Sequence, residues 1–413
     1  NLMFLSKVME RVVLDQLLCH IKKCNLYEIY QSAYKVNHST ETALLKVASD
    51  ILDGIDNRNV CLLTLLDLSA AFDTIDHEIL LTRLEVTFGI SGTVLLWLRS
   101  YLTNRYQCVS IGSKHSNNVA LNCGVPQGSV LGPVLFTLYT QPLAKILTSF
   151  NMNYHFYADD TQLYTFGPPE QIPDLLEATK VCVERVKLWM TSNKLQLNDA
   201  KTEIILIKNP KCVNAIPDNL STLSLTINDS CVTSCDNITN LGVIFNCKMD
   251  MSPYVHQLCK SLYFQLKKIS NIRPYLSNEV TKTLVSTLIL SKLDYCNSLL
   301  AGAPHETLQQ LQKVQNHSAR LICKKKKSCH ITPLLFDLHW LPVEYRINYK
   351  LCSIVYKCLH GSAPDYLSNR LNLYSPARTL RSSNDKTVLK KPQRSYKSSG
   401  CRSFSHMGPH CWN

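Results

Sequence analysis

The sequence predicts an α+β fold, with a small sheet in the N-terminal half and a mostly helical C-terminal region. Residues 61–66, Cys-Leu-Leu-Thr-Leu-Leu, form a nearly unbroken apolar run that is typical of a strand buried on both faces. Residues 156–164 hold two short apolar and aromatic runs around Asp159-Asp160, which predicts a hairpin. From Ser252 onward, apolar residues recur at helical spacing.

The remaining elements follow from periodicity and capping residues. Helical spacing predicts a helix over residues 3–22, and Ser39 or Thr40 is a suitable cap for the next one. Asp76 is a suitable N-cap for a third helix, and Pro133 fits the first turn of a helix that continues over 134–147. Further helices are expected over 94–102, 172–192, 255–269, 277–293, 306–323 and 345–360, and strands over 202–208, 223–227 and 241–245.

Composition limits the class of protein. With 413 residues, 45% hydrophobic and 18% charged, the chain is long and apolar enough for two or three globular domains. The net charge of +13 indicates a polyanionic partner, with nucleic acid first and an anionic membrane surface second. A basic protein without such a partner is the alternative that charge alone leaves open.

The 18 cysteines do not form a recognisable framework. No Cys-x-x-Cys occurs, and neither Cys323, Cys329 and His330 nor the terminal group of Cys401, His406, His410 and Cys411 has zinc-ligand spacing. We therefore expect free thiols, with no disulfide partner. The sequence has no secretory leader pattern and no run of about 18 apolar residues, so we expect an intracellular protein without a membrane partner, in the nucleus, the cytoplasm or both. It starts at Asn1 and stops at Asn413 without a closing element, and we expect a truncated piece of a longer reading frame.

Three carboxylates are the candidate catalytic group. Asp159 and Asp160 are adjacent in the predicted hairpin turn, where like charges repel unless a cation lies between them. Asp67 ends the buried strand, and a sheet can bring it beside this pair. Carboxylate oxygens favour Mg²⁺ or Mn²⁺, and two such ions about 3.5–4 Å apart would support phosphoryl or nucleotidyl transfer. An ordinary surface turn is the alternative for Asp159-Asp160 alone.

Two nearby segments suggest a nucleotide substrate. Phe72 follows Asp67 by five residues, where a bulky ring could exclude a 2′-hydroxyl, although an ordinary core Phe is the preferred interpretation of this residue taken alone. The loop Gly124-Val125-Pro126-Gln127-Gly128-Ser129 would let backbone approach a ligand closely.

Together these blocks resemble the reverse transcriptase of non-LTR (LINE-type) retrotransposons, close to the jockey-like branch. The resemblance covers roughly residues 2–245. The matching blocks are Gln31-Ser32-Ala33-Tyr34-Lys35 with residues 38–44, residues 65–73 around Asp67, residues 124–133, Tyr157-Ala158-Asp159-Asp160, Asn198 with Lys201-Thr202-Glu203, and Asn240-Leu241-Gly242-Val243.

The resemblance implies a right-hand polymerase with an antiparallel palm sheet. Partial fingers would span 1–60, the palm with inserted fingers helices 61–250, a helical thumb-like and C-terminal region 251–380, and a basic flexible tail 381–413. The tail carries seven Lys/Arg and one acidic residue. The implied activity is that of an RNA-directed DNA polymerase, a nucleotidyltransferase that uses an RNA template, a DNA primer and dNTPs.

The resemblance also implies roles for individual residues. Asp67, Asp159 and Asp160 would be the catalytic ligands of two Mg²⁺ ions, with Mn²⁺ as a possible substitute. Phe72 would be the sugar gate, Gln127 and Gly128 would lie against the nascent base pair and template, and Lys201 would approach the triphosphate and give a proton to pyrophosphate. Lys35 stands where the family usually has Arg, so it keeps the charge of a nucleotide-binding residue but loses the bidentate grip.

Other interpretations stay open. Lys324, Lys325, Lys326 and Lys327 could contact nucleic-acid phosphates or act as a nuclear address, or they could simply be a solvated helix end. A catalytically inactive retrotransposon remnant would bind nucleic acid without polymerising. A two-metal phosphohydrolase would explain the carboxylates but neither the Gln127-Gly128 loop nor the position of Phe72.

Overall fold

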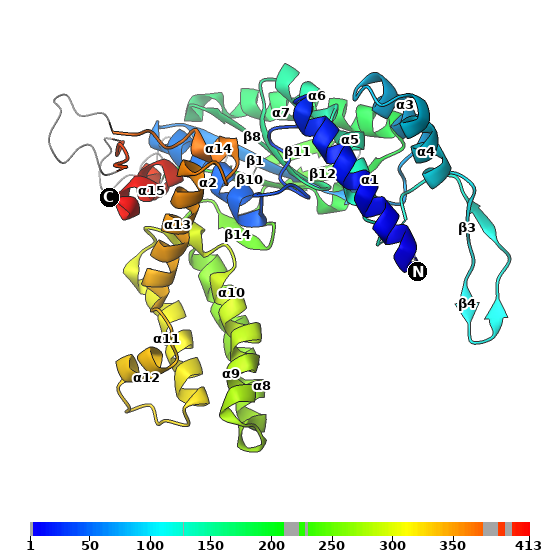
Figure 1. The fold of residues 1–413 in the computed structure, drawn as a ribbon. Coiled ribbons are helices and arrows are strands. Elements are labelled where there is room, and N and C mark those ends of the chain that lie inside the picture. The colour runs from blue at the N-terminus through cyan, green and yellow to red at the C-terminus, as the bar shows by residue number, and fades with distance from the viewer. Residues whose placement is uncertain (1–2, 127, 210–222, 228–229, 375–386, 393–398) are drawn as a thin grey trace.

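A computed structural model describes residues 3–126, 128–209, 223–227, 230–374, 387–392 and 399–413. A body of helices surrounds a small central sheet, and a helical arm and a narrow two-stranded ribbon project from it (Figure 1). The predicted α+β fold with a helical C-terminal region is confirmed. Within these ranges, no helix combines the length and apolar character needed to cross a bilayer.

The central sheet has four antiparallel strands in the order β10-β1-β8-β7. They are β1 (Val60–Leu66), β7 (Asn153–Tyr157), β8 (Asp160–Gly167) and β10 (Glu203–Ile207). The predicted hairpin is present as β7 and β8, which are joined by the two-residue turn Ala158-Asp159. The predicted buried strand is β1, which lies between β8 and β10.

Alternate residues of β1 face two different cores, which explains its unbroken apolar run. Leu63 belongs to the core formed with α2 (Thr40–Asp56) and the C-terminal helices. Leu62 belongs to the core formed with the helices of the other face. Because both side chains are at most 2% exposed, a polar residue at either position would lose its solvation.

The helices of the body begin where the sequence supplies caps. Ser39 caps α2 and forms a capping box with Thr42, and the Asp76 carboxylate accepts the first free N–H groups of α3 (His77–Val86). The expected continuous helix over 134–147 is wrong: it is divided into α5 (Gly132–Thr140) and α6 (Leu143–Ser149), because Pro142 stands at the break and cannot donate a backbone hydrogen bond. The remaining helices here are α1 (Phe4–Lys23), α4 (Gly92–Leu102) and α7 (Ile172–Ser192).

Short strands complete the body and form the ribbon. The strand expected around 241–245 is present as β14 (Val243–Asn246), and it starts two residues later because Leu241 and Gly242, both with positive φ, form the turn of a hairpin. The short strands are β2 (Leu68–Ser69) paired with β9 (Gln196–Leu197), β11 (Ser224–Ile227) with β12 (Ser230–Thr233), β13 (Asn237–Asn240) with β14 (Val243–Asn246), and, in the projecting ribbon, β3 (Arg105–Gln107) with β6 (Val119–Leu121) and β4 (Ser110–Ile111) with β5 (Lys114–His115).

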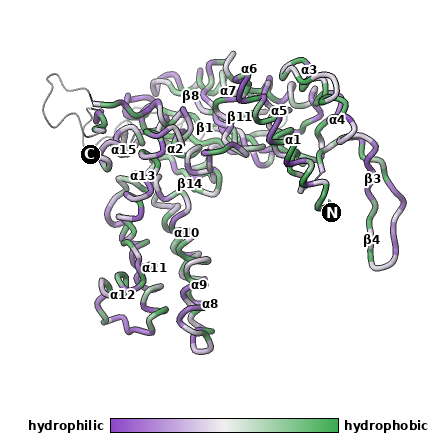
Figure 2. The backbone as a smooth tube through the Cα atoms, in the orientation of Figure 1, coloured by the Kyte–Doolittle hydropathy of each residue, from purple (hydrophilic) through white to green (hydrophobic). Residues whose placement is uncertain are grey.

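The helical arm is built from amphipathic helices that pack along one another. Its main contact is between α8 (Ser252–Ile272) and α11 (His305–Ile322), and Figure 2 shows hydrophobic and hydrophilic residues alternating along both. The expected helix over 277–293 is interrupted by a π-helical segment, Ser286–Leu290. The other helices of this region are α9 (Asn278–Val285), α10 (Ser291–Asp294), α12 (Ile331–Asp337), α13 (Val343–Leu359) and α14 (Asp365–Ser368).

The expected flexible tail over 381–413 is wrong for its final residues. Residues 399–402 form a 3₁₀ turn, and α15 (Phe404–Trp412) packs against α13 and α2. Phe404 is 1% exposed and its N–H donates to Ser49 Oγ at 3.0 Å. Burying this ring offsets the entropy of ordering a Ser-rich, basic segment, which composition alone could not predict.

Candidate active site

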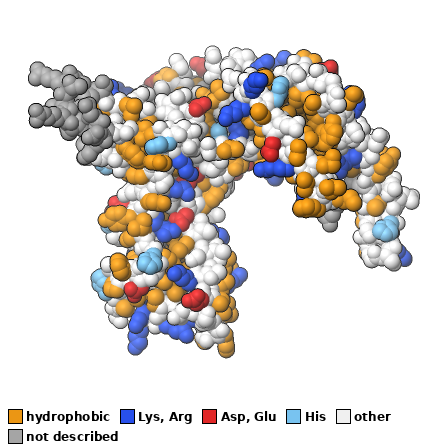
Figure 3. All heavy atoms as spheres, in the orientation of Figure 1, with side chains coloured by type: hydrophobic (Ala, Val, Ile, Leu, Met, Phe, Trp, Pro, Cys, Tyr) orange, Lys and Arg blue, Asp and Glu red, His pale blue; other side chains and the backbone are white. Residues whose placement is uncertain are grey.

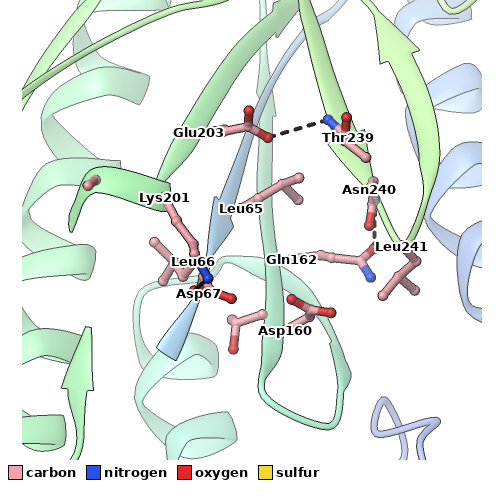
Figure 4. Close-up of a pocket in the computed structure, with 12 residues that line it drawn as sticks. Leu65, Leu66, Asp67, Asp160, Gln162, Lys201, Glu203, Thr239, Asn240 and Leu241 are labelled. Carbon is pink, nitrogen blue, oxygen red and sulfur yellow. Dashed lines mark hydrogen bonds and ion pairs between the residues drawn. The ribbon is translucent and has the colours of Figure 1, made fainter. Parts of the chain in front are cut away.

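Asp67 and Asp160 face one pocket at the end of the central sheet. Leu66 pairs with Thr161 in the β1–β8 register, so the next residues outward, Asp67 and Asp160, stand opposite each other. Alternation along the strands puts both side chains on the sheet face of Leu65 and Gln162. All four residues line a pocket of about 360 Å³, which Figure 4 shows in close-up.

Asp159 lies in the turn beside this pocket and does not line it. The turn is fixed by Ala158, whose φ is +56°, and by the side chain of Gln31. Gln31 Oε1 accepts the Ala158 N–H at 3.1 Å, and its amide donates to Ala158 O at 3.4 Å. Gln31 is 4% exposed and was not predicted to have a role. It acts as a fixed support for the β7–β8 hairpin, which carries two of the three carboxylates.

The pKa values of Asp159 and Asp160 are raised by burial and by the like charges around them. Burial, then Asp159, then Asp67 raise the pKa of Asp160 to about 6. Burial first, and the negative charge of Asp67 as well, also raise the pKa of Asp159. Lys201 acts in the opposite direction on both groups. The site therefore holds a surplus of negative charge that a cation would relieve.

Lys201 reaches the pocket from a short 3₁₀ turn, Asp199–Lys201, that follows β9. Its Nζ lies 3.1 Å from Asp67 Oδ2, and Figure 4 shows the ammonium directed at this carboxylate. The turn is held by Asn198, whose N–H donates to Asp67 O at 2.9 Å, and by Lys187, whose Nζ contacts Asp199 at 2.5 Å. Lys201 therefore lies beside the carboxylate of Asp67, and its predicted contact with a triphosphate stays a prediction.

The other wall of the pocket is the β13–β14 hairpin. Asn240 Nδ2 donates to Gln162 Oε1 at 3.1 Å, and the backbone N–H of Thr239 donates to Glu203 at 3.3 Å (Figure 4). Gln162 is 1% exposed, and its Nε2 has no hydrogen-bond partner among the described residues. Gln162 follows Asp160 by two residues on the same sheet face, and Glu203 stands opposite Leu65 on that face. Strand alternation could have identified Gln162, whereas the place of Glu203 depends on the long-range pairing of β1 with β10.

The glycine loop lies between the Asp67 segment and α5. Gly124 has a φ of +82°, its N–H donates to Ile75 O at 2.8 Å, and an added Cβ would lie 2.9 Å from Asp73 O. Gly128 is exposed with a φ of +79°. These conformations favour glycine and keep the backbone accessible. Gln127 lies outside the described residues.

Phe72 and Lys35 do not line the pocket. The Phe72 ring packs on Phe136, with centroids 4.8 Å apart, and its carbonyl accepts the Val125 N–H at 2.9 Å, so it supports the entrance of the glycine loop. The Lys35 ammonium hydrogen-bonds to Glu28 O and lies 4.8 Å from the Tyr27 ring centroid. Burial lowers the pKa of Lys35 to about 8. Their predicted nucleotide contacts stay predictions.

The four consecutive lysines lie far along the arm, in the loop after α11. All four are exposed, and Lys324 and Lys325 border a groove of about 530 Å³ between α8 and α11. Lys267 and Arg320 line the same groove. Figure 3 shows Lys and Arg side chains gathered at this end of the arm. The structure therefore separates this basic cluster from the carboxylate pocket.

The donor chemistry of the pocket suits a divalent cation. Asp67 and Asp160 offer hard oxygen ligands, and Lys201 already supplies a positive charge beside Asp67. Over the described part of the chain, however, no three His, Cys, Asp or Glu side chains form a group arranged to hold a metal ion. The fit is therefore one of residue type and charge, and the three-carboxylate ligand set stays a prediction.

Comparisons with known proteins identify the family to which this chain is similar. The family model for reverse transcriptase (RNA-dependent DNA polymerase) matches residues 1–245. The probable RNA-directed DNA polymerase from transposon X-element of Drosophila melanogaster is 24% identical over 355 residues, which are 83% of this chain and 37% of that protein. The RNA-directed DNA polymerase from mobile element jockey of Drosophila funebris is 23% identical over 326 residues, 77% of this chain and 34% of that protein.

Among solved structures, apo telomerase from Candida tropicalis is similar, with 12% identity and a TM-score of 0.44 over 86% of this chain and 59% of that one. The chain spans about a third of the length of the X-element and jockey relatives. The family match covers more than half of the chain, including the whole carboxylate pocket. The chain therefore belongs to the reverse transcriptase (RNA-dependent DNA polymerase) family, with its right-hand polymerase fold, and within it to the non-LTR, LINE-type retrotransposon branch.

Proposed function

We propose that this chain is an RNA-directed DNA polymerase. It would transfer a deoxynucleotide from a dNTP to the 3′-hydroxyl of a DNA primer on an RNA template and release pyrophosphate. The observation that carries the proposal is the pairing of Asp67 and Asp160 across neighbouring strands, in a pocket that also receives Lys201. Family membership supports nucleotidyl transfer as the chemistry of this pocket.

Asp67 and Asp160, with Asp159 beside them, would hold two Mg²⁺ ions. When bound, these ions would lower the pKa of the primer 3′-hydroxyl and offset charge on the triphosphate. The raised pKa values of Asp159 and Asp160 support this role, because a cation would relieve the repulsion that raises them. Lys201 Nζ would move from Asp67 to the triphosphate and donate a proton to the departing pyrophosphate.

The neighbouring segments would position the substrates. Gly128, with Gln127, would present backbone to the nascent base pair and the template. The Phe72 carbonyl accepts a hydrogen bond from Val125 in the same loop. At this place its ring would act as a sugar gate against the 2′ position of the incoming nucleotide. Lys35 would bind nucleotide only after leaving Glu28 O and the Tyr27 ring.

We assign the fingers to residues 1–60, the palm with its inserted fingers helices to 61–250, and the thumb-like region to 251–380. In this assignment the arm follows the nucleic acid away from the pocket. The groove lined by Lys267, Arg320, Lys324 and Lys325 would contact backbone phosphates, and Lys326 and Lys327 would extend this surface. Such contacts do not depend on sequence and weaken as salt rises.

Primer extension tests the proposal. The purified chain is given a DNA primer annealed to an RNA template, with dNTPs and Mg²⁺, and the products are sized. Template-directed extension is expected. Salt-dependent binding without extension would instead indicate a non-catalytic remnant, and phosphoester cleavage without incorporation would indicate a phosphohydrolase.

A further inference from the structure

We propose that Glu10 is a positioning residue that fixes the exit of the glycine loop, at residues 130 and 131, and so sets how tightly the enzyme holds an incoming nucleotide. The inference rests on the proposed polymerase function. Glu10 lies on α1, more than a hundred residues before the loop, and does not line the carboxylate pocket. It would act through the loop and touch no reactant.

The Glu10 carboxylate gathers donors from three separate elements. Its Oε2 accepts the backbone N–H of Val130 at 2.7 Å, the N–H of Leu131 at 3.1 Å and the hydroxyl of Tyr101 on α4 at 3.2 Å. Its Oε1 accepts the hydroxyl of Ser6 at 3.3 Å. The two backbone donors directly precede α5. One side chain therefore ties α1 and α4 to the segment where the loop becomes a helix.

Because Glu10 is buried, losing these hydrogen bonds would lower the stability of the protein. Glu10 is 2% exposed, and across the described residues no Lys, Arg or His forms an ion pair with it. Its charge is compensated by the N–H groups at the start of α5, where the helix dipole also favours an anion. If residues 130 and 131 moved away, a buried carboxylate would lose its main donors.

The loop is thus fixed at both ends. At its entrance, Val125 N–H donates to Phe72 O and Gly124 N–H to Ile75 O, which ties it to the segment following Asp67. At its exit, Glu10 holds residues 130 and 131. Gly128 lies between these anchors, exposed and in a left-handed conformation. Because the loop is short, a change at Glu10 would shift or loosen the backbone at Gly128.

A purely structural role is the competing explanation, and Glu41 provides a matched control. Glu41 is 7% exposed and accepts the Ser298 N–H at 3.1 Å and the Ser298 hydroxyl at 2.6 Å. It also pairs with Lys350 at 3.2 Å. Both glutamates are buried on a helix and bind a backbone N–H and a hydroxyl, but Glu41 joins α2 to residues 297–300 and has no contact with the glycine loop.

The test compares Glu10→Gln, Glu10→Ala and Glu41→Gln. The measurements are the KM for dNTP and the kcat of primer extension, melting temperature, and amide hydrogen exchange at Val130 and Leu131. We expect Glu10→Gln to raise the KM about ten-fold with a smaller change in kcat, and Glu10→Ala to raise it further, because Gln keeps one acceptor. Exchange at Val130 and Leu131 should accelerate in both. Glu41→Gln should lower the melting temperature but leave the KM and these two amides unchanged.

An equal KM in Glu10→Gln and Glu41→Gln, or unchanged exchange at both amides in Glu10→Ala, would overturn the inference. Loss of the proposed function is a separate outcome. If the unmodified protein does not extend a primer, the polymerase assignment fails, while the exchange measurement still decides whether Glu10 holds the loop.

Discussion

Asp67 and Asp160 stand opposite each other on neighbouring antiparallel strands, one step beyond the Leu66–Thr161 pair. This register, rather than any local motif, creates the site. A shift of one residue between β1 and β8 would turn one carboxylate to the opposite face of the sheet. The two cores that bury alternate residues of β1 prevent such a shift, so the hydrophobic pattern of the strand also keeps the two carboxylates opposite each other.

Asp160→Asn should stabilise the protein in the absence of divalent cations. The pKa of Asp160 is raised from 3.8 to about 6 in the folded state, so the folded protein favours the neutral carboxyl. That stabilising contribution is complete below pH 3.8 and is lost as pH rises through about 6. At pH 7.5 the wild type carries a penalty that Asn lacks. We expect the variant to melt roughly 1–2 °C higher, after allowance for solvent screening of this partly exposed group.

The same melting experiment tests cation binding. Added Mg²⁺ should raise the melting temperature of the wild type and have a smaller effect on Asp160→Asn. Asp76→Asn is the control, because Asn also caps α3 and Asp76 lies outside the pocket. An equal Mg²⁺ response in wild type and Asp160→Asn would argue against a cation at this carboxylate.

Gly124→Ala should destabilise the protein more than Gly128→Ala. Both residues have φ near +80°, so alanine at either costs about 1 kcal/mol of backbone strain. Only at Gly124 would the new Cβ also lie 2.9 Å from a backbone atom, Asp73 O, whereas at Gly128 no atom of the described residues lies within 4 Å. Chemical denaturation of the two variants measures the difference. Equal losses would mean that the Gly124 loop entrance adjusts freely.

The Asn240–Gln162 hydrogen bond should couple the β13–β14 hairpin to β8, the strand that begins at Asp160. Both side chains are at most 2% exposed, so Asn240→Ala leaves a buried amide without its partner, and we expect a stability loss of about 1–3 kcal/mol. A double-mutant cycle with Gln162→Ala should give a coupling energy above about 0.5 kcal/mol. Additive losses would show that the two amides contribute independently.

His155 should make the protein sensitive to acid. It is fully buried, and its pKa lies well below 6.5 because of burial and the positive charges of Lys46, His38 and Lys35. Below pH 6.5 the unfolded chain binds a proton that the folded protein does not, so stability falls as pH falls, by at most about 1.4 kcal/mol per pH unit for one such group. His155→Gln should reduce this slope between pH 7.5 and 5.5.

Denaturation curves at several pH values measure the slope. The exposed His330→Gln is the control and should keep the wild-type slope. A His155→Gln slope equal to that of the wild type would assign the acid sensitivity to other groups.

Local sequence signals predicted well those elements that depend on interactions between neighbouring residues. The apolar run of β1, the Ser39 and Asp76 caps and the Asp159-Asp160 hairpin depend on residues within a few positions of each other. Two differences from the prediction also have local signals: Pro142 stands at the α5–α6 break, and Gly242 in the β13–β14 turn sets the later start of β14.

Long-range contacts could not be predicted in this way. Gln31 supports a turn 127 residues away, and Glu10 binds backbone 120 residues away. In a single sequence each is an ordinary polar residue, because its role depends on which distant segment folds against it. The burial of Phe404 by α2 and α13 likewise reversed the prediction for a segment whose composition indicates flexibility.

Single-nucleotide incorporation into a DNA primer on an RNA template tests the central claim most directly. Asp67→Asn, Asp159→Asn and Asp160→Asn should each lower the incorporation rate at least about a hundred-fold, because each removes charge from one shared site, whereas Asp76→Asn should retain most activity. Primer binding should be unchanged in all four variants. Near-wild-type incorporation by Asp67→Asn or Asp160→Asn would contradict the account.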